Sequence, residues 1–172
     1  MRRIGPIQML SVGFDGNRFK GEIAPELDRL KQQDIIRILD LLFVRKDGLG
    51  NVSITTASDL DWQEAIEFGE YLGTLVGFAA GGPEGADRGA IAGAAELADG
   101  HFFDKDDAFR LTQALPNNMS AAIVLIEHRW ALPLLDAIER ADGVELSNRW
   151  VNVEDLLAAG FQAAEDQGAL EP

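Results

Sequence analysis

Hydrophobic and polar residues follow each other along this chain in patterns that predict both strands and helices. Two apolar runs, IQMLSVGF (7–14) and AAIVLIEH (121–128), have the composition of strands, and an amphipathic helix follows each. The apolar residues of each helix share one face. They are Ile23, Leu27 and Leu30 in the first helix, and Leu134, Leu135 and Ile138 in the second. The chain is therefore expected to contain two strand–helix segments.

A β-hairpin is predicted directly after the first of these helices. The run IIRILDLLFVRK (35–46) is rich in β-branched residues and ends at DGLGN, which is a turn signal. The next segment alternates its side chains through Val52, Ile54 and Thr56. Two such runs around a short turn indicate antiparallel pairing.

The two strand–helix segments are related by an internal repeat with a constant offset of 108 residues. Two unrelated amphipathic helices would share some apolar positions by chance, but a shared proline and two shared aspartates favour a repeat. These pairs are Pro25 with Pro133, Asp28 with Asp136, and Asp34 with Asp142. A β-branched run follows each helix, so each half is expected to form a strand, a helix and a strand.

Two βαβ halves with an antiparallel hairpin predict an α+β fold with a ferredoxin-like core. Within a single domain of residues 1–172, the first half and its hairpin strand would occupy 7–58, and the second half 120–152. The two repeat helices would cover one face of the sheet. The other face needs a cover of its own, and the segment between the halves, 59–116, is the candidate. A C-terminal helix and tail would occupy 153–172.

Glycines at intervals of four residues mark this middle segment. Glycine is a poor helix former, so its repetition at helical spacing favours close approach of another backbone. Asp59 or Asp61 can cap a helix that begins at Trp62, Gly81–Pro83 would end it, and a second helix would run to about Ala98. The segment is thus a predicted helical hairpin. The glycines expected in close packing are Gly69, Gly73, Gly77, Gly81, Gly85, Gly89 and Gly93.

Three interpretations of this glycine row are open. The two arms of the hairpin pack on each other, or the row forms a contact between subunits. The third interpretation, insertion into a membrane, needs about 18 or more consecutive apolar residues. The apolar stretch from Tyr71 to Gly82 is shorter, and charged residues follow it. We therefore expect the glycines to serve packing or assembly.

Composition narrows the classes of partner. The net charge is −14, with 29 acidic and 15 basic residues. Proteins that bind nucleic acid or anionic lipid carry basic surfaces, so neither partner is expected. A basic protein partner or divalent cations would fit the acidic surface. The absence of cysteine excludes disulfides and thiolate sites, and the N-terminus has no signal segment, so we expect a cytoplasmic protein.

Two strand-to-helix corners are the candidates for a ligand site. The first is the sequence Glu127, His128, Arg129 and Trp130. A histidine can act as a general base, a metal ligand or a haem ligand, but adjacent Glu127 and His128 would face opposite sides of a strand. The other histidine, His101, shows no ligand spacing to it. We favour a structural role for His128 and expect no catalytic residue, metal or cofactor.

The second corner, Asp15 to Arg18, follows the first strand and is the counterpart of residues 127–130 in the repeat. Asp15 and Arg18 would pair with Glu127 and Arg129 across the pseudo-twofold axis as a salt-bridge cluster. They would alternatively line a pocket for a small anion.

The motifs GNRFKGEIAPEL and IEHRWALPL, together with the glycine-rich centre, resemble a family of uncharacterised, mostly actinobacterial proteins that carry a domain of unknown function. The resemblance covers most of the chain and implies no activity, cofactor or catalytic residue. A related group is labelled as predicted membrane proteins, but this chain has a shorter apolar middle and more charges.

The sequence thus favours a non-enzymatic structural, scaffolding or regulatory protein that associates with itself. The first alternative is a small-ligand or metal-binding protein, or an enzyme, that uses the two strand-end corners. The second alternative is a peripheral membrane protein that binds through the glycine-rich hairpin.

Overall fold

The computed structural model of this chain describes residues 3–144. The chain divides into two compact units, residues 1–135 and residues 136–172. The larger unit holds the sheet and helices α1 to α3, while α4 (Ala131–Arg140) begins in it and ends in the smaller unit. The strand expected to close the second half of the repeat and the helix expected over 153–172 lie outside the described residues.

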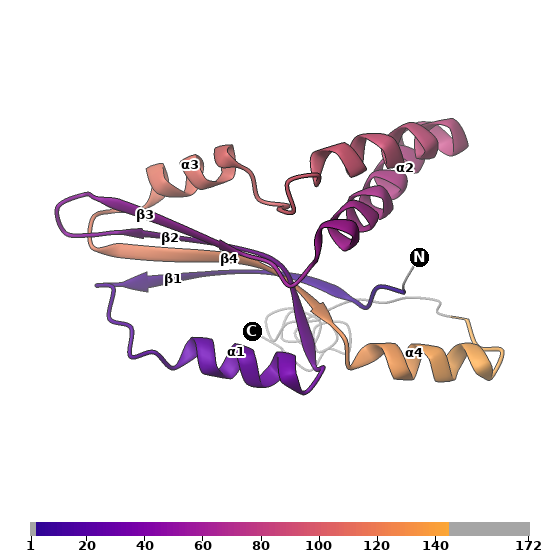
Figure 1. Cartoon of the computed structure of the whole chain (residues 1–172), viewed down its shortest axis with the longest axis horizontal. Coiled ribbons are helices and arrows are strands. Elements are labelled where there is room, and N and C mark those ends of the chain that lie inside the picture. Colours follow the sequence, from indigo (N-terminus) through magenta and orange to yellow (C-terminus); the bar gives the residue numbers. More distant parts are fainter. Residues whose placement is uncertain (1–2, 145–172) are drawn as a thin grey trace, which may run out of the picture. The chain divides into compact units, whose positions relative to one another are not determined.

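Within residues 3–144 the sheet has four strands in the order β1-β4-β2-β3, and every neighbouring pair is antiparallel (Figure 1). The strands are β1 (Ile7–Asp15), β2 (Ile36–Lys46), β3 (Val52–Ala57) and β4 (Met119–His128). Both predicted apolar strands and the predicted hairpin are confirmed, because β2 pairs with β3 around the DGLGN turn. The α+β class is confirmed too. The ferredoxin-like arrangement is not, since its last strand would follow α4, beyond residue 144.

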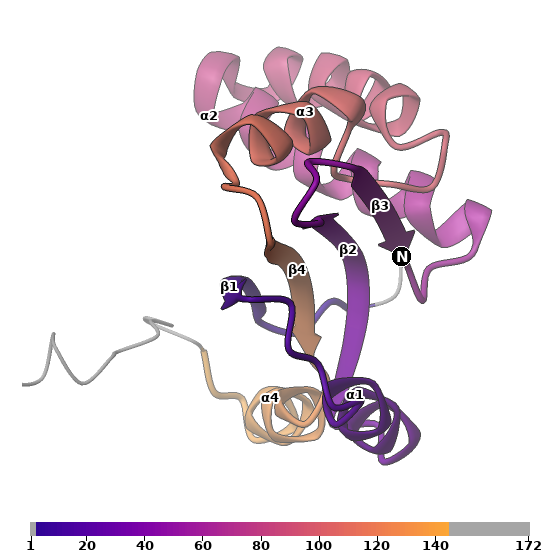
Figure 2. The same ribbon diagram turned by 90° about the vertical axis from the view of Figure 1, so that its left-hand side faces the viewer.

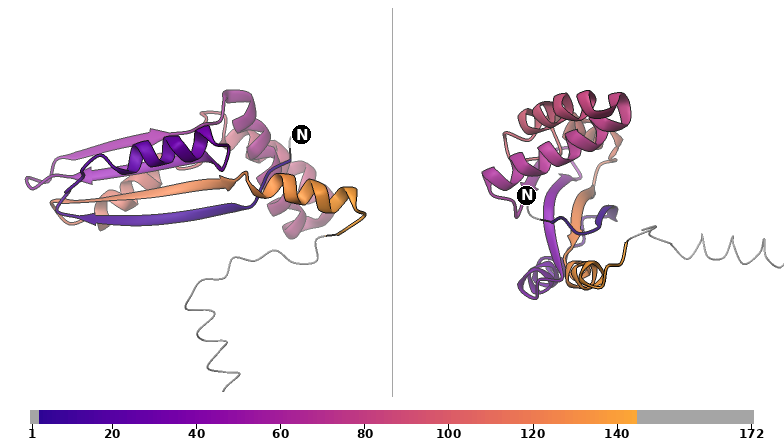
Figure 3. Two further views of the ribbon diagram at one scale, coloured as in Figure 1. Left: turned by 90° about the horizontal axis from the view of Figure 1, so that it is seen from below. Right: turned by 90° about the vertical axis from the view of Figure 1, so that its right-hand side faces the viewer.

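One face of the sheet packs against α1 (Ile23–Gln32), which lies below the sheet in Figure 2 and in front of it in the left view of Figure 3. Alternation along a strand sends every second side chain to the same face. Val124 and Ile126 of β4 therefore join Ile36 and Ile38 of β2 in one buried cluster. Leu27 and Leu30 of α1 pack against that cluster, so two of the three residues on the predicted apolar face contact the sheet, while Ile23 is half exposed.

The opposite face packs against α2 (Trp62–Glu96) and α3 (Lys105–Ala114), which lie above the sheet in Figure 2. Its cluster joins side chains of β2 and β4 to those of the middle segment. The members contributed by the sheet include Leu39, Leu42, Val44 and Leu125, and those of the middle segment include Phe68, Leu97, Phe103 and Ala108. The segment between β3 and β4 thus covers the second face of the sheet.

Helix α2 is two helices joined by a sharp turn. It begins with a capping box, in which the Asp61 carboxylate accepts the backbone N–H of Glu64 at 2.9 Å and the Glu64 carboxylate accepts that of Asp61 at 3.1 Å. Gly81 and Gly82 leave the helical conformation immediately before Pro83. The predicted cap at Asp61 and the predicted break are confirmed. No helix among residues 3–144 is long and apolar enough to cross a membrane.

Candidate functional site

The two arms of α2 meet through their glycines. Three pairs face each other across the hairpin, namely Gly69 with Gly93, Gly73 with Gly89, and Gly77 with Gly85. A Cβ added to any of the six would overlap the carbonyl oxygen of its partner and lie 2.7–3.0 Å from the partner's carbonyl carbon. The hydrogen that replaces this Cβ points at the oxygen, as in the Cα–H···O contacts of closely packed helices.

The seventh glycine of the row does not take part in this contact. A Cβ on Gly81 would meet only the guanidinium of Arg88, at 3.7 Å, which is an ordinary packing distance. Gly81 instead begins the turn between the arms. The structure therefore places six glycines inside one chain's own hairpin, and these positions face a neighbouring backbone already.

A stripe of apolar residues on the first arm leaves the core partway along the helix. Ala65, Phe68, Leu72 and Val76 follow helical spacing on one face. Ala65 and Phe68 are 0% and 3% exposed against the sheet, whereas Val76 is 70% exposed. The tip of the hairpin projects away from the sheet (Figure 1), so the same stripe continues without a cover. Further exposed apolar side chains on the two arms are Leu75, Phe78 and Ile91.

This stripe forms one wall of a groove along the hairpin, with a volume of about 540 Å³. The glycines form its floor, Leu72 and Val76 line one arm, and Ala92 lines the other. Phe102 stands at the end nearer the sheet, and charged side chains of the second arm, Arg88 and Glu96, also line it. The groove therefore has the apolar interior and charged margin that are typical of a surface for a protein partner.

At the other candidate site, the end of β4, the carboxylate of Glu127 is held inside the protein. Glu127 is 3% exposed, and its Oε1 accepts the backbone N–H of Gly5 at 2.8 Å. Its Oε2 lies 3.8 Å from a guanidinium nitrogen of Arg129. Arg129 also forms an ion pair with Asp34, which raises the pKa of the arginine. The buried carboxylate is thus partly neutralised by a cation that has a second anionic partner.

His128 points to the opposite face of β4 from Glu127, as the adjacent positions of a strand require. Its Nε2 lies 3.1 Å from Gln8 Oε1, and the indole N–H of Trp130 donates to its Nδ1 at 3.4 Å. These contacts fit a neutral ring with the proton on Nε2. Burial lowers the pKa of His128, which also favours the neutral ring. The ring is thus held between the Gln8 amide and the Trp130 indole.

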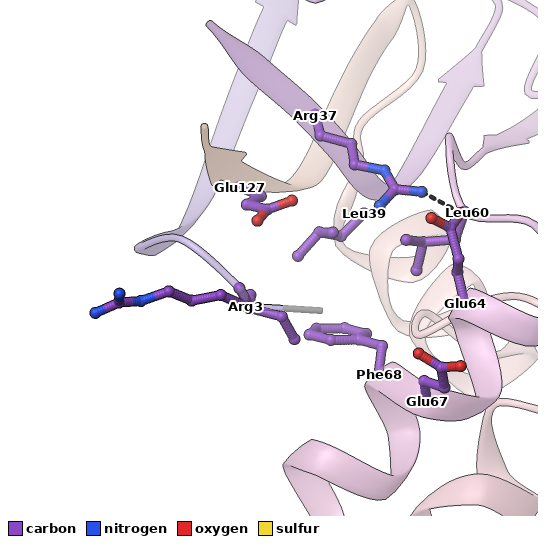
Figure 4. Close-up of a pocket in the computed structure, with 9 residues that line it drawn as sticks. Arg3, Arg37, Leu39, Leu60, Glu64, Glu67, Phe68 and Glu127 are labelled. Carbon is purple, nitrogen blue, oxygen red and sulfur yellow. Dashed lines mark hydrogen bonds and ion pairs between the residues drawn. The ribbon is translucent and has the colours of Figure 1, made fainter. Parts of the chain in front are cut away.

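Glu127 faces a small cavity between the sheet and the start of α2 (Figure 4). The cavity has about 40 Å³ open to the centre of a water molecule, which is room for about three waters. Arg37, Glu64, Glu67 and Phe68 line it as well. Arg37 forms an ion pair with Glu64, drawn as a dashed line in Figure 4. Charged and apolar side chains both line the cavity, which is too small for an organic ligand, and the described lining contains no hydroxyl, thiol or imidazole nucleophile.

The structure separates the two predicted corners. In the register of β1 and β4, Ile7 lies opposite Glu127, while Asp15 lies opposite Met119 at the other end of the strands. Eight residues of strand correspond to about 26 Å. The expected cluster of Asp15 and Arg18 with Glu127 and Arg129 is therefore wrong, and no single pocket can use both corners. The repeat suggested their proximity, but antiparallel pairing of β1 with β4 places equivalent ends apart.

Asp40 is a buried polar residue that the sequence reasoning missed. Asp40 lies at an irregularity in the pairing of β2 with β4 and is fully buried. Its Oδ2 accepts the backbone N–H groups of Phe102 and Phe103, both at 2.7 Å, and its Oδ1 accepts Nδ1–H of His101 at 2.9 Å. The carboxylate thus fixes the loop between α2 and α3 to the sheet. A single acidic residue within an apolar run was the only signal for it.

The described residues contain no group of three or more histidine, cysteine, aspartate or glutamate side chains arranged to hold a metal ion. The groove along the glycine hairpin is lined mainly by glycine, alanine and aliphatic side chains, together with Phe102, Arg88 and Glu96. Comparison with known proteins finds no matching family model, no similar curated protein and no similar solved structure.

Proposed function

We propose that this chain is a non-enzymatic structural or scaffolding protein that associates with copies of itself through the glycine hairpin. The observation that carries the proposal is the stripe Ala65–Phe68–Leu72–Val76, which is buried at its start and exposed at its end. Covering one large apolar side chain stabilises a contact by about 1.5–3 kcal/mol. Val76 lies on the groove, and Leu75, Phe78 and Ile91 are further exposed apolar side chains of the same projecting element.

The charges of the glycine hairpin disfavour a lipid surface as its partner. The hairpin carries six acidic side chains and one arginine between Trp62 and Glu96, so anionic lipid would repel it. Its apolar surface is interrupted by these carboxylates, which suits a protein contact with a polar margin more than burial in hydrocarbon. The glycines support the proposal indirectly, because their close contact joins the two arms into a single projecting element.

The alternative of a ligand-binding protein or enzyme has less support. It relied on two corners acting together, and β1–β4 pairing separates them. The cavity beside Glu127 accommodates only a few waters. This alternative would become the better one if purified protein carried a chromophore or a stoichiometric metal.

Light scattering on the purified full-length chain tests the proposal. We expect a discrete multiple of the chain mass, 18.7 kDa, for the wild type. Val76→Asp and Ile91→Asp should shift the mass towards the monomer. Leu49→Asp is the matched control. Leu49 is 89% exposed in the β2–β3 turn, away from the glycine hairpin of α2, so this substitution should leave the mass unchanged.

A monomeric wild type at the highest attainable concentration would overturn the proposal. So would sedimentation of the wild type with zwitterionic or anionic vesicles, if Val76→Asp abolished it, because the hairpin would then be a membrane-binding element. Thermal unfolding of each variant shows that a change in mass does not come from loss of folding.

Three further parts of this proposal come from the sequence patterns. They are the ferredoxin-like arrangement, a cytoplasmic location, and membership of the uncharacterised, mostly actinobacterial family that GNRFKGEIAPEL and IEHRWALPL resemble. The internal repeat supports the first of these, and the absence of cysteine fits the second.

A further inference from the structure

We infer that two copies pair through the second arms of their hairpins, antiparallel and about a twofold axis at Ala92, with Arg88 of each copy against Glu96 of the other. This inference rests on the proposed self-association and specifies its geometry. It is carried by the position of three side chains on one helical ridge and by the groove that they share.

Arg88, Ala92 and Glu96 are spaced four residues apart, so they form a single ridge along the second arm. All three line the same groove, whose opposite wall contains Val76. The residue at the centre of the ridge is small and exposed. A second helix can therefore approach closely at Ala92 while apolar side chains of the first arm cover its flank.

The charges on this ridge are self-complementary in one orientation only. A twofold axis through Ala92 maps residue 88 of one copy onto residue 96 of the other, so each dimer contains two contacts between arginine and glutamate. Parallel pairing would instead place arginine against arginine and glutamate against glutamate. Like charges across an interface disfavour that orientation.

Both side chains are available for such contacts. Across residues 3–144, neither Arg88 nor Glu96 makes an ion pair or a hydrogen bond within the chain, although other arginines, such as Arg37 and Arg129, do. Arg88 is also the single cation among seven charged residues of the hairpin. Arg88 and Glu96 carry opposite charges at two places along the groove, so the two ends of the groove differ in charge.

Ridges of residues spaced by four pack into each other at a crossing angle of about −50°. The groove of about 540 Å³ receives the partner's ridge, and the partner's groove receives the first ridge in return. Each copy would thus cover the exposed Val76 of the other. The contact is isologous and closes as a dimer, so it does not propagate into a filament.

Charge reversal tests the pairing. Arg88→Glu and Glu96→Arg each replace both attractive contacts of a dimer by repulsive ones, and each should weaken dimerisation on the order of tenfold. The double variant Arg88→Glu/Glu96→Arg restores both contacts and should dimerise like the wild type. A mixture of the two single variants should form a heterodimer, because both contacts then join a glutamate of one variant to an arginine of the other.

A cysteine at the axis gives a second test, since the chain contains no cysteine of its own. Under mild oxidation Ala92→Cys should form a covalent dimer, because a twofold axis brings the two identical positions together. Leu49→Cys is the control, because Leu49 is also exposed but lies in the β2–β3 turn, and it should crosslink much more slowly.

The outcomes separate this inference from the proposed function. A monomeric wild type overturns both. A wild-type oligomer whose affinity is the same in both single charge reversals, or that Ala92→Cys does not crosslink, overturns the antiparallel pairing while self-association through the hairpin stands. Weaker assembly in the single variants with recovery in the double variant and in the mixture supports the pairing.

Discussion

The backbone of Gly73 lies directly against the carbonyl group of Gly89, with no room for a side chain between the two arms of the hairpin. A Cβ on Gly73 would stand 2.7 Å from the carbonyl carbon of Gly89 and 3.1 Å from Cα of Gly93. Both neighbours are backbone atoms of a helix, so neither can rotate away. The arms would have to separate along the whole contact.

We therefore expect Gly73→Ala to lower the free energy of unfolding by about 1–3 kcal/mol, although alanine favours a helix more than glycine does. Chemical denaturation measures this. Gly13→Ala is the control, because a Cβ on Gly13 meets nothing within 4 Å, and it should be neutral or slightly stabilising. An unchanged midpoint for Gly73→Ala would show that the arms do not touch.

The turn between the arms requires glycine for a different reason, which is the backbone conformation of Gly82. Gly82 has φ 61° and ψ −150°, a conformation that residues with a side chain rarely adopt. A Cβ there would meet nothing within 4 Å, so any cost of Gly82→Ala comes from the backbone alone. We expect a loss of about 1–3 kcal/mol in the free energy of unfolding.

Gly48→Ala isolates this effect, since Gly48 is equally open but does not have a positive φ. It should change the free energy of unfolding by less than about 0.5 kcal/mol. Equal effects of the two substitutions would argue against the turn at Gly82.

Replacing Asp40 by asparagine should destabilise the protein by about 1–3 kcal/mol. The amide has one acceptor oxygen where the carboxylate has two, and its NH₂ group would face the N–H groups of the loop. Hydrogen exchange should show faster exchange at the amides of Phe102 and Phe103 in this variant. Asp99→Asn is the control, because exposed Asp99 also accepts a loop N–H, that of His101 at 3.1 Å, and its loss should matter little.

If the Phe102 and Phe103 amides kept their protection in Asp40→Asn, the loop would be held by its apolar packing rather than by the carboxylate.

The pKa of His128 predicts how stability depends on pH. Burial lowers this pKa from its ordinary value of 6.5, so the unfolded chain binds the proton more readily than the folded protein does. The contribution is fully present above about pH 6.5 and is lost as the pH falls through the lower folded value. His128→Gln should remove this part of the pH dependence.

The free energy of unfolding at about pH 7.5 and about pH 5.5, for the wild type and for His128→Gln, measures the difference. His101→Gln controls for the other histidine. A wild type that lost no more stability on acidification than His128→Gln would contradict the assignment.

Local pattern was enough to predict much of this fold. The apolar runs, the DGLGN turn, the cap at Asp61 and the break before Pro83 are each encoded within a few residues, and each is found in the structure. The choice between packing within the chain and packing between chains was not encoded in this way. It depended on whether the turn at Gly82 lets Gly69 reach Gly93, which only the structure shows.

The polar sites were harder to predict, because they depend on the register between distant strands. Arg37 lies opposite Glu127 only through the pairing of β2 with β4, across 90 residues of sequence. The sequence likewise does not reveal the register between β1 and β4, and for this reason Asp15 and Glu127 were expected to lie close together. Asp40 has no polar neighbour in sequence that explains its burial, since its partners are amides of a loop more than 60 residues away.

The repeat of four in the glycine row has a consequence for how the hairpin finds its alignment. Sliding one arm by four residues, about 6 Å, would again set glycine against glycine. The glycine surfaces of the two arms therefore fit each other equally well in several registers, and they cannot select one register by themselves. The short turn at Gly81–Pro83 and the anchoring of Phe68 and Leu97 in the core must supply that reference. Lengthening the turn by two residues, which adds up to about 7 Å of chain, would free the arms to shift by one step of four residues.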